Sequence, residues 1–415
     1  MNKSENDEPN ELRGAVRQGR SLAALAPIMA IVFAAYLVIG LAMPVLPLHV
    51  HQGLGLSAFV VGLVAGSQFA ATLLTRVWAG SQADTRGAKR AIVTGLLLAA
   101  AAGLLYFLSL SFVATPAKSV TILLLGRAVL GGGESFIVAG ALIWGLARVG
   151  TERTGTVLAQ VGTAMYVAYA VGAPLGAALY ANYGFAAIAL ATTLIPLGAL
   201  LIVASLRSVA PMRRARPRLA SVIGAVWAPG LGLAFASVGF GAITTFIALL
   251  FAQHGWAQAW LALTLLSIAF AGGRLVLGHL PDRIGGAKIA LISVLIEALG
   301  QALIWLAPWS AGALVGAALT GLGYSLVYPG FGVEAVRHTP PESRGLVTGA
   351  YTACLDLALG LSSPALGLIA SGAGLGAVFL ASTLVVLCAA PVAMRLLRTP
   401  AGRATARAYA AGGRR

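Results

Sequence analysis

Residues 80–90, GSQADTRGAKR, place four charged side chains in a chain that is only 10% charged. Residues 278–288, GHLPDRIGGAK, repeat this stretch with Gly278, Asp282 and Gly285 at the same spacing. A polar motif that occurs twice in an apolar chain indicates internal duplication. These two stretches therefore decide how the rest of the sequence is divided.

The composition is that of a membrane protein. Hydrophobic residues make up 59% of the 415 residues, and the mean hydropathy is +0.90. Helices need about 20 apolar residues to cross a bilayer, and the long runs here, with Gly and Pro inside them, favour helices over the short strands of a β-barrel. We predict an all-α polytopic membrane protein. Its twelve expected spans are 21–46, 57–80, 88–112, 119–147, 154–180, 184–206, 220–251, 257–279, 287–307, 312–336, 344–370 and 373–397.

Positive charge lies on one side of these spans. Residues 1–20 are polar and the first span lacks a clear signal-peptide cleavage site, so we expect it to stay uncleaved. The net charge is +16, yet Lys118 alone among Lys and Arg falls in the loops of the second side. The positive-inside rule then predicts cytoplasmic termini in a bacterial inner membrane, with basic loops against anionic lipids. Since no basic face is interleaved with aromatic residues, we expect no nucleic-acid partner.

The second half of the chain aligns on the first. An offset of 198 residues superposes Arg76 on Arg274, and an offset of 190 then superposes Gly131 on Gly321. Two parallel six-helix halves are typical of secondary transporters, which bind substrate between the halves. The predicted division is a cytoplasmic tail 1–20, a bundle 21–206, a basic cytoplasmic linker 207–219, a bundle 220–397 and a basic tail 398–415.

The stretch at 80–90 resembles the loop between the second and third helices of the major facilitator superfamily, G-x-L-A-D-R-x-G-R-K, through Gly80, Asp84, Gly87 and Lys89. It departs from that pattern where Gln82, Thr85 and Ala88 stand. Together with SVGFGAITTFIALLFAQHGW at 237–256, the region 57–90 looks like the YhhS-type bacterial permeases, commonly grouped with sugar or drug efflux proteins. This resemblance implies a major facilitator fold of 12 transmembrane helices and a transport function.

The two loop copies form the predicted gating loop. Glycine at a corner enters positive φ readily, a carboxylate can bind free amides at a helix N-terminus, and cations can bridge to acids or lipid phosphates. Such contacts can hold one conformation and break when the halves rock; the alternative is that these residues only orient the protein in the membrane. The predicted loop residues are Gly80, Asp84, Arg86, Gly87, Lys89, Arg90, Gly278, Asp282, Arg283 and Gly285.

Ionisable side chains inside spans mark candidate functional groups, because they are costly in hydrocarbon. Arg127 and Glu134 are seven residues apart, on one helical face about 10 Å apart, with Gly131 expected to clear the space between them. Asp356 lies on a small, polar face of the eleventh span. Either acid can bind a proton as a proton-coupled carrier requires, or can merely satisfy buried partners. Arg127 also matches an arginine of a fourth-helix motif in proton-coupled exporters of the superfamily, where it is thought to tune a nearby acid.

The fifth span contains YAVGAPLGAALY at 169–180, which resembles the antiporter motif G-P-x-x-G-G at Gly172, Pro174 and Gly176. Ala173 intervenes in the motif, and Ala177 replaces its last glycine. In the superfamily this motif accompanies export. A role in close helix packing fits the same small residues equally well.

Candidate substrate contacts are aromatic and neutral polar residues of the central spans, which suit an amphipathic organic solute. They are Tyr36, Gln68, Trp144, Gln160, Tyr166, Thr244, Phe246, Tyr324 and Tyr328.

Other polar residues predict structural roles. Glu297 lies in the ninth span with Gln301 on its helical face, and we expect it to form structural hydrogen bonds. We expect Glu334 to pair with Arg337. His49 and His51 have no nearby acids or cysteines, so we expect no metal site. Without a P-loop or a nucleophile and base on a soluble domain, we expect neither an enzyme nor a cofactor.

We therefore predict a secondary transporter that exports a small organic compound in exchange for protons by alternating access. The alternative is a proton symporter that imports a sugar or organic acid, and sodium coupling is left open. The expected partners are the solute, protons and membrane lipids, and we expect a monomer.

Overall fold

The computed structural model describes residues 8–150, 153–209, 219–337, 339 and 344–398, and the secondary structure of this part is entirely helical. The first half contains α1 (Glu8–Ala42), α2 (Leu46–Leu48), η1 (His49–Gly53), α3 (Ala58–Arg86), α4 (Ala88–Leu110), α5 (Pro116–Val149) and α6 (Thr154–Ser205). The second half contains α7 (Leu219–Gln253), α8 (Ala259–Leu277), α9 (Leu280–Ile284), α10 (Gly286–Leu306), α11 (Ser310–Val336), α12 (Arg344–Ala373), α13 (Leu375–Leu387) and α14 (Ala389–Arg398).

Eleven segments of the described chain are long and apolar enough to cross a membrane, and one of them makes two crossings. Helix α6 is 52 residues long, which at the helical rise is about 78 Å, more than twice a bilayer core. Gly184 interrupts it with φ 68° and ψ −169°, a conformation that glycine adopts readily. The fifth and sixth predicted spans thus run into each other at Gly184, and the count of twelve agrees with the predicted fold.

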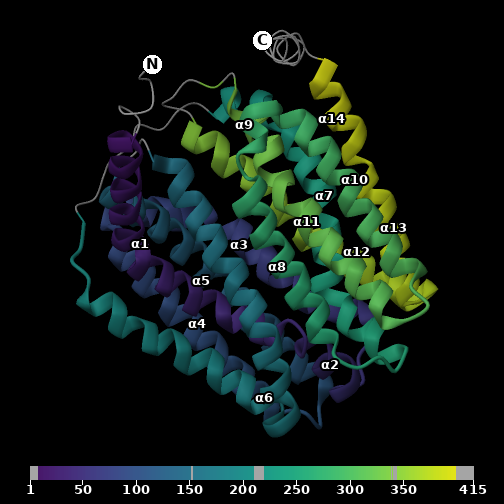
Figure 1. The fold of residues 1–415 in the computed structure, drawn as a ribbon. Coiled ribbons are helices and arrows are strands. Elements are labelled where there is room, and N and C mark those ends of the chain that lie inside the picture. Colours follow the sequence, from purple (N-terminus) through teal and green to yellow (C-terminus); the bar gives the residue numbers. More distant parts are fainter. Residues whose placement is uncertain (1–7, 151–152, 210–218, 338, 340–343, 399–415) are drawn as a thin grey trace.

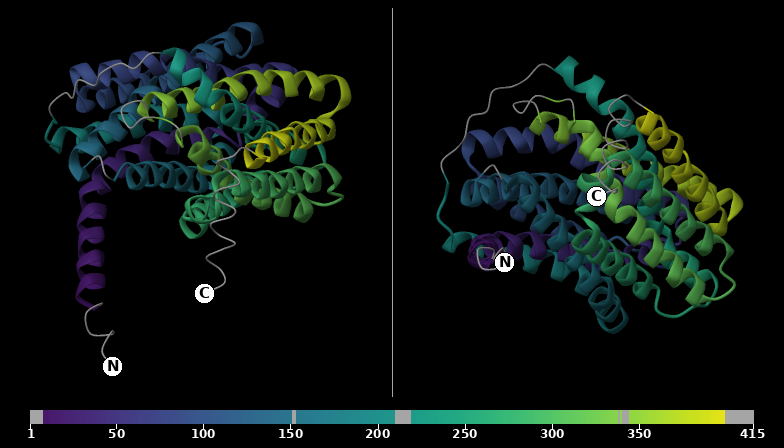
Figure 2. Two further views of the ribbon diagram at one scale, coloured as in Figure 1. Left: turned by 90° about the horizontal axis from the view of Figure 1, so that it is seen from above. Right: turned by 45° about the horizontal axis from the view of Figure 1, so that its top comes forward.

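The crossings form two six-helix bundles that lie side by side (Figure 1). The start of α1 and the end of α14 lie at one end of the molecule, here called the termini end, and α2 lies at the other, the far end. The first turns of α1 project beyond the body (Figure 2). Because α1 begins at Glu8, part of the predicted tail 1–20 is helical, as its Glu, Leu, Arg and Ala residues favour.

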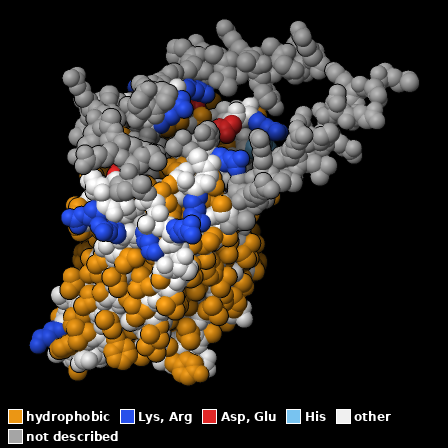
Figure 3. Space-filling model, turned by 90° about the vertical axis from the view of Figure 1, so that its left-hand side faces the viewer, with side chains coloured by type: hydrophobic (Ala, Val, Ile, Leu, Met, Phe, Trp, Pro, Cys, Tyr) orange, Lys and Arg blue, Asp and Glu red, His pale blue; other side chains and the backbone are white. Residues whose placement is uncertain are grey.

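The face drawn in Figure 3 is apolar along most of its height. The described chain exposes large hydrophobic side chains, among them Leu104, Leu201 and Leu275. In Figure 3, Lys and Arg side chains gather above this apolar band, toward the termini end. Such a band is the surface that a lipid bilayer covers.

The backbone of the two halves repeats at matching contacts. An added Cβ on Gly131 of α5 would overlap the carbonyl oxygen of Gln68 in α3. One on Gly321 of α11 would overlap the carbonyl oxygen of Leu266 in α8, at the repeat-related positions. The sequence offsets of 198 and 190 residues therefore describe a repeat in space.

The predicted gating loop is mostly helical. Gly87 and Gly285 turn the chain with φ of 97° and 100°, as expected for corner glycines. The expectation is wrong for Gly80, which lies inside α3, and for Gly278, whose φ is −60°. Helix α3 runs on to Arg86 because no helix breaker stands between Ser81 and Arg86.

Two hydrogen bonds join the bundles toward the far end. The backbone N–H of Phe59 donates to Ser371 Oγ at 3.2 Å, joining α3 to α12. Thr264 Oγ1 of α8 donates to the Ala170 carbonyl of α6 at 3.3 Å. Contacts between the bundles are thus concentrated on two helix pairs, α3–α12 and α6–α8, which are here called the two arms of the interface.

Candidate functional site between the two bundles

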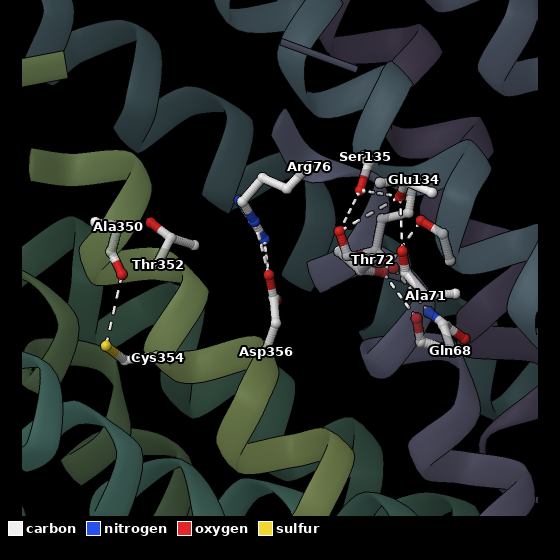
Figure 4. A network of polar contacts seen from close by, with 12 residues as sticks. Gln68, Ala71, Thr72, Arg76, Glu134, Ser135, Ala350, Thr352, Cys354 and Asp356 are labelled. Carbon is white, nitrogen blue, oxygen red and sulfur yellow. Dashed lines mark hydrogen bonds and ion pairs between the residues drawn. The ribbon is translucent and has the colours of Figure 1, made fainter. Parts of the chain in front are cut away.

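An ion pair between Arg76 of α3 and Asp356 of α12 joins the bundles inside their spans (Figure 4). Arg76 Nε donates to Asp356 Oδ2 at 2.7 Å, and Nη2 donates to the same oxygen. The Asp356 side chain is 4% exposed and that of Arg76 26%. Sequence reasoning identified Asp356 and missed Arg76, although Arg76 is a charge inside the span 57–80 and was already aligned with Arg274.

Glu134 of α5 binds two uncharged donors from other helices. The Tyr36 hydroxyl of α1 and Gln68 Nε2 of α3 donate to its two carboxylate oxygens, each at 2.8 Å. Gln68 Oε1 has no partner in the described chain, so rotation of the amide would present an acceptor to a protonated carboxyl. The structure thus brings together three predicted site residues, in an arrangement that suits either protonation state of Glu134.

Helices α3 and α5 are held together beside Glu134 by hydroxyl groups (Figure 4). Thr72 Oγ1 donates to the carbonyls of Gln68 at 2.9 Å and Gly131 at 3.1 Å, and Ser135 Oγ donates to the Thr72 carbonyl at 2.9 Å. Gly131 permits this close approach of α3. The expectation that it clears space between Arg127 and Glu134 is therefore wrong.

Arg127 does not pair with Glu134. Its side chain is 7% exposed, and its Nε has no hydrogen-bond partner among the described residues. The hydroxyl of Tyr169 lies within electrostatic range of both charges. The two charges therefore lie near one tyrosine hydroxyl without forming an ion pair with each other.

A chain of aromatic rings crosses from one bundle to the other. The ring of Tyr36 lies 5.7 Å from that of Tyr169, which lies 5.5 Å from Tyr166. Tyr166 stacks on Phe270 of α8 at 3.4 Å, and Phe270 lies 5.9 Å from Tyr324 of α11. Three predicted substrate contacts, Tyr36, Tyr166 and Tyr324, therefore share one aromatic surface, which is buried at the interface in this conformation.

The remaining candidate contacts lie apart from this surface. The Tyr328 hydroxyl hydrogen-bonds with Thr352 Oγ1 at 2.8 Å. Trp144 and Phe246 are also fully buried, and no ring contact joins either of them to this aromatic surface in the described part of the chain. Thr244 donates to a carbonyl of its own helix at 2.9 Å, and Gln160 is partly exposed near the start of α6.

The cations of the first loop copy make local contacts. Lys89 Nζ donates to the carbonyls of Ala204 at 3.2 Å and Leu206 at 2.6 Å, which holds α4 to the end of α6. Arg86 Nη1 reaches Gln82 Oε1 at 3.5 Å, Arg90 is exposed, and Asp84 is partly buried.

In the second copy, Asp282 and Arg283 are exposed. The expected carboxylate at a helix N-terminus is instead Glu334, whose Oε1 accepts from the Ala287 N–H of α10 at 3.1 Å. Its Oε2 lies 3.0 Å from Arg337 Nη1, so the predicted pairing is confirmed. Sequence reasoning missed the capping role, because nothing local places α11 beside the start of α10.

The antiporter-like glycines pack α6 against α1 within the first bundle. An added Cβ on Gly172 would crowd the backbone of Gly40, and one on Gly176 would overlap that of Leu41. Pro174 lies between them inside α6. These contacts are those of the packing alternative.

Glu297 lies inside the second bundle without the hydrogen bonds expected of it. It is 0% exposed, and neither carboxylate oxygen has a partner in the described chain. The neighbouring Gln301 does form bonds, donating to the Gly239 carbonyl at 3.2 Å and to Thr320 Oγ1 at 3.1 Å. Across the described ranges, no three His, Cys, Asp or Glu side chains are grouped to hold a metal ion.

A family model described as the Major Facilitator Superfamily matches residues 28–296 and 230–413. An uncharacterized MFS-type transporter of Salmonella typhimurium is 43% identical over 384 residues, covering 92% of this chain and 99% of that protein. One of Burkholderia pseudomallei is 41% identical over 372 residues, covering 89% and 90%.

Two solved structures share the fold. A bacterial homologue of the human lysosomal transporter Spinster, in an inward-facing and occupied conformation, aligns with a TM-score of 0.70 at 16% identity, covering 92% of this chain and 97% of that one. A nucleoside transporter aligns with a TM-score of 0.69 at 13% identity, covering 90% and 100%.

Proposed function

Because this chain belongs to the Major Facilitator Superfamily and is a membrane transporter, we propose that it exports a small organic compound in exchange for protons. The observation that carries the proposal is the Arg76–Asp356 ion pair, which ties the bundles together. Protonation of Asp356 removes its charge and weakens that tie. Proton binding thereby favours a conformation in which α3 and α12 separate, as an alternating-access cycle requires.

Glu134 is the second proton-binding group of this mechanism. Its partners Tyr36 and Gln68 are uncharged, so its protonation breaks no ion pair. It lies within electrostatic range of Asp356, so a proton on one acid changes the affinity of the other. The adjoining aromatic surface supplies contacts for the apolar part of a solute.

The direction is supported by the antiporter-like motif at 172–176 and by the likeness to YhhS-type permeases. The cations at the termini end support cytoplasmic termini in a bacterial inner membrane. In that orientation the hydrogen bonds that join α3 to α12 and α6 to α8 lie toward the outer side, which suits a conformation that takes up solute from the cytoplasm.

Growth inhibition across a panel of toxic compounds tests export. Cells that overproduce the chain are compared with cells that overproduce Glu134→Gln, Asp356→Asn at equal membrane abundance. We expect raised resistance to one compound class, lost in the double variant. Glu297→Gln is the matched control, since it changes a buried carboxyl group that has no hydrogen-bond partner among the described residues and no part in the Arg76–Asp356 ion pair. Raised sensitivity would instead favour the uptake symporter.

Proton exchange is tested in everted membrane vesicles with a pH-sensitive dye. Adding the compound found in the growth panel should dissipate an imposed proton gradient with the natural chain and with Glu297→Gln. If the double variant dissipates it equally, the assignment of coupling to these two acids is wrong.

A further inference from the structure

Arg274 of α8 is the repeat counterpart of Arg76, but the counterpart of Asp356, the acid that pairs with Arg76, is a tyrosine. The 190-residue offset that aligns the later spans places Tyr166 opposite Asp356. Asp356 of α12 meets Arg76 of α3, and Tyr166 of α6 lies within electrostatic range of Arg274 on α8. The α3–α12 contact and the α6–α8 contact are therefore repeat counterparts. The first pairs a cation with an acid, and the second pairs a cation with a tyrosine.

The surroundings of Arg274 are aromatic and uncharged. Its Nη1 lies 3.5 Å from the Ser325 carbonyl oxygen, at the outer limit of a hydrogen bond, and its guanidinium lies 5.7 Å from the ring centre of Tyr328. The hydroxyls of Tyr324 and Tyr351 lie within electrostatic range. In the part of the chain that the structure describes, no carboxylate lies within 4.0 Å of this partly exposed side chain.

A guanidinium inside a membrane span is costly unless it meets a counter-charge. We propose that the counter-charge of Arg274 is the substrate itself, a small organic oxyanion such as a carboxylate. The planar N–H fork of arginine matches two oxygens of such a group. The rings of Tyr166, Phe270 and Tyr324 lie next to this arginine and are buried in this conformation, so separation of the bundles at this contact would present them to the apolar body of the anion.

This inference rests on the proposed export function and names its substrate class. It also has an electrical consequence. An anion leaving and a proton entering move charge in the same sense, so a potential that is negative inside favours both movements. Uptake of the same anion with one proton would move no net charge.

The first experiment measures melting temperatures of the purified full-length chain with matched ligands. The probes are benzoate, 2-naphthoate and indole-3-acetate, each with its amide and its amine. We expect carboxylates to raise the melting temperature, with the amides and amines giving little or no shift. A set in which no carboxylate stabilises the protein, or in which the amides do so equally, overturns the proposal.

The second experiment changes the charge at the site. Arg274→Gln should weaken carboxylate binding at least tenfold, and Arg274→Lys should retain part of it. Tyr166→Asp supplies the acid that this arm lacks, so it should weaken binding at least tenfold more than Tyr166→Asn, a change of the same size without charge. Lys118→Gln, an exposed cation at the far end, should bind as the natural chain does.

Melting temperatures without ligand report whether each variant folds. Unchanged carboxylate binding in folded Arg274→Gln, or equal binding in Tyr166→Asp and Tyr166→Asn, overturns the proposal. Export of neutral or cationic compounds alone, with proton exchange that depends on Glu134 and Asp356, would also overturn it while the proposed function stands.

Discussion

The two bundles share their backbone contacts but differ in chemistry where they face each other. Gly131 and Gly321 bring matching helices equally close in the two halves. At the interface, Asp356 corresponds to Tyr166, and Glu134 corresponds to Tyr324. Close helix packing therefore requires the same glycines inside both bundles, whereas the residues that face the other bundle differ in charge between the halves. Two acids, Asp356 and Glu134, lie at or beside the α3–α12 contact, whereas no carboxylate of the described chain lies within 4.0 Å of Arg274 on α8.

A second difference lies inside the bundles. Glu297 of α10 is fully buried without a hydrogen-bond partner among the described residues, and its counterpart at the 198-residue offset is Ala99 of α4, which is also buried. A buried carboxylate is thus tolerated in one bundle where the other has a methyl group. Unlike Asp356, it takes no part in the ion pair that joins the bundles.

Reversing the charged arm should have the largest effect. Arg76→Asp and Asp356→Arg each leave like charges facing each other, and losing a buried partner costs about 3 kcal/mol, or roughly 100-fold. We expect each single variant to lose transport by about this factor, and the exchanged pair to recover to within about tenfold. Transport in everted vesicles at equal protein amount measures this. If the exchanged pair folds but is as inactive as the single variants, the attraction between these two side chains is not sufficient to explain the loss of transport.

The shared backbone can be tested by two matched substitutions of intermediate effect. Gly131→Ala and Gly321→Ala each force a Cβ against a carbonyl oxygen of a neighbouring helix, so each should lower stability by about 1–3 kcal/mol. Melting in detergent reports the loss. Gly162→Ala in α6 is the control, because nothing lies within 4 Å of its added Cβ, and it should stabilise by up to about 1 kcal/mol. A loss of stability in only one of these two variants would show that the two glycine contacts are not equivalent.

Glu297→Gln should have the smallest effect and so sharpen the contrast with the interface acids. The carboxylate makes no hydrogen bond that glutamine would lose, so transport should stay within about twofold. The melting temperature should be unchanged or higher, because an unpartnered buried carboxylate is removed. A folded variant without transport would show that this acid takes part in the cycle.

Much of the fold follows from local pattern. The spans, the fifth and sixth crossings and the duplication can be predicted because apolar length and glycine spacing are properties of short segments. The sequence also indicates Glu134, Tyr36 and Gln68 as site residues, because polar groups inside spans are costly. Their mutual hydrogen bonds, the pairing of Arg76 and the capping role of Glu334 were not predictable, since each depends on a neighbour from another helix.

The number of crossings, the internal repeat and the positions of the charges inside the spans can all be read from the sequence. Which charges meet depends on how the helices pack. Arg76 and Asp356 are 280 residues apart in the chain, and Arg274 differs from Arg76 through what the facing helix presents to it. The physical reason is that the cost of a charge in hydrocarbon is set locally, whereas its compensation depends on the helices packed against it.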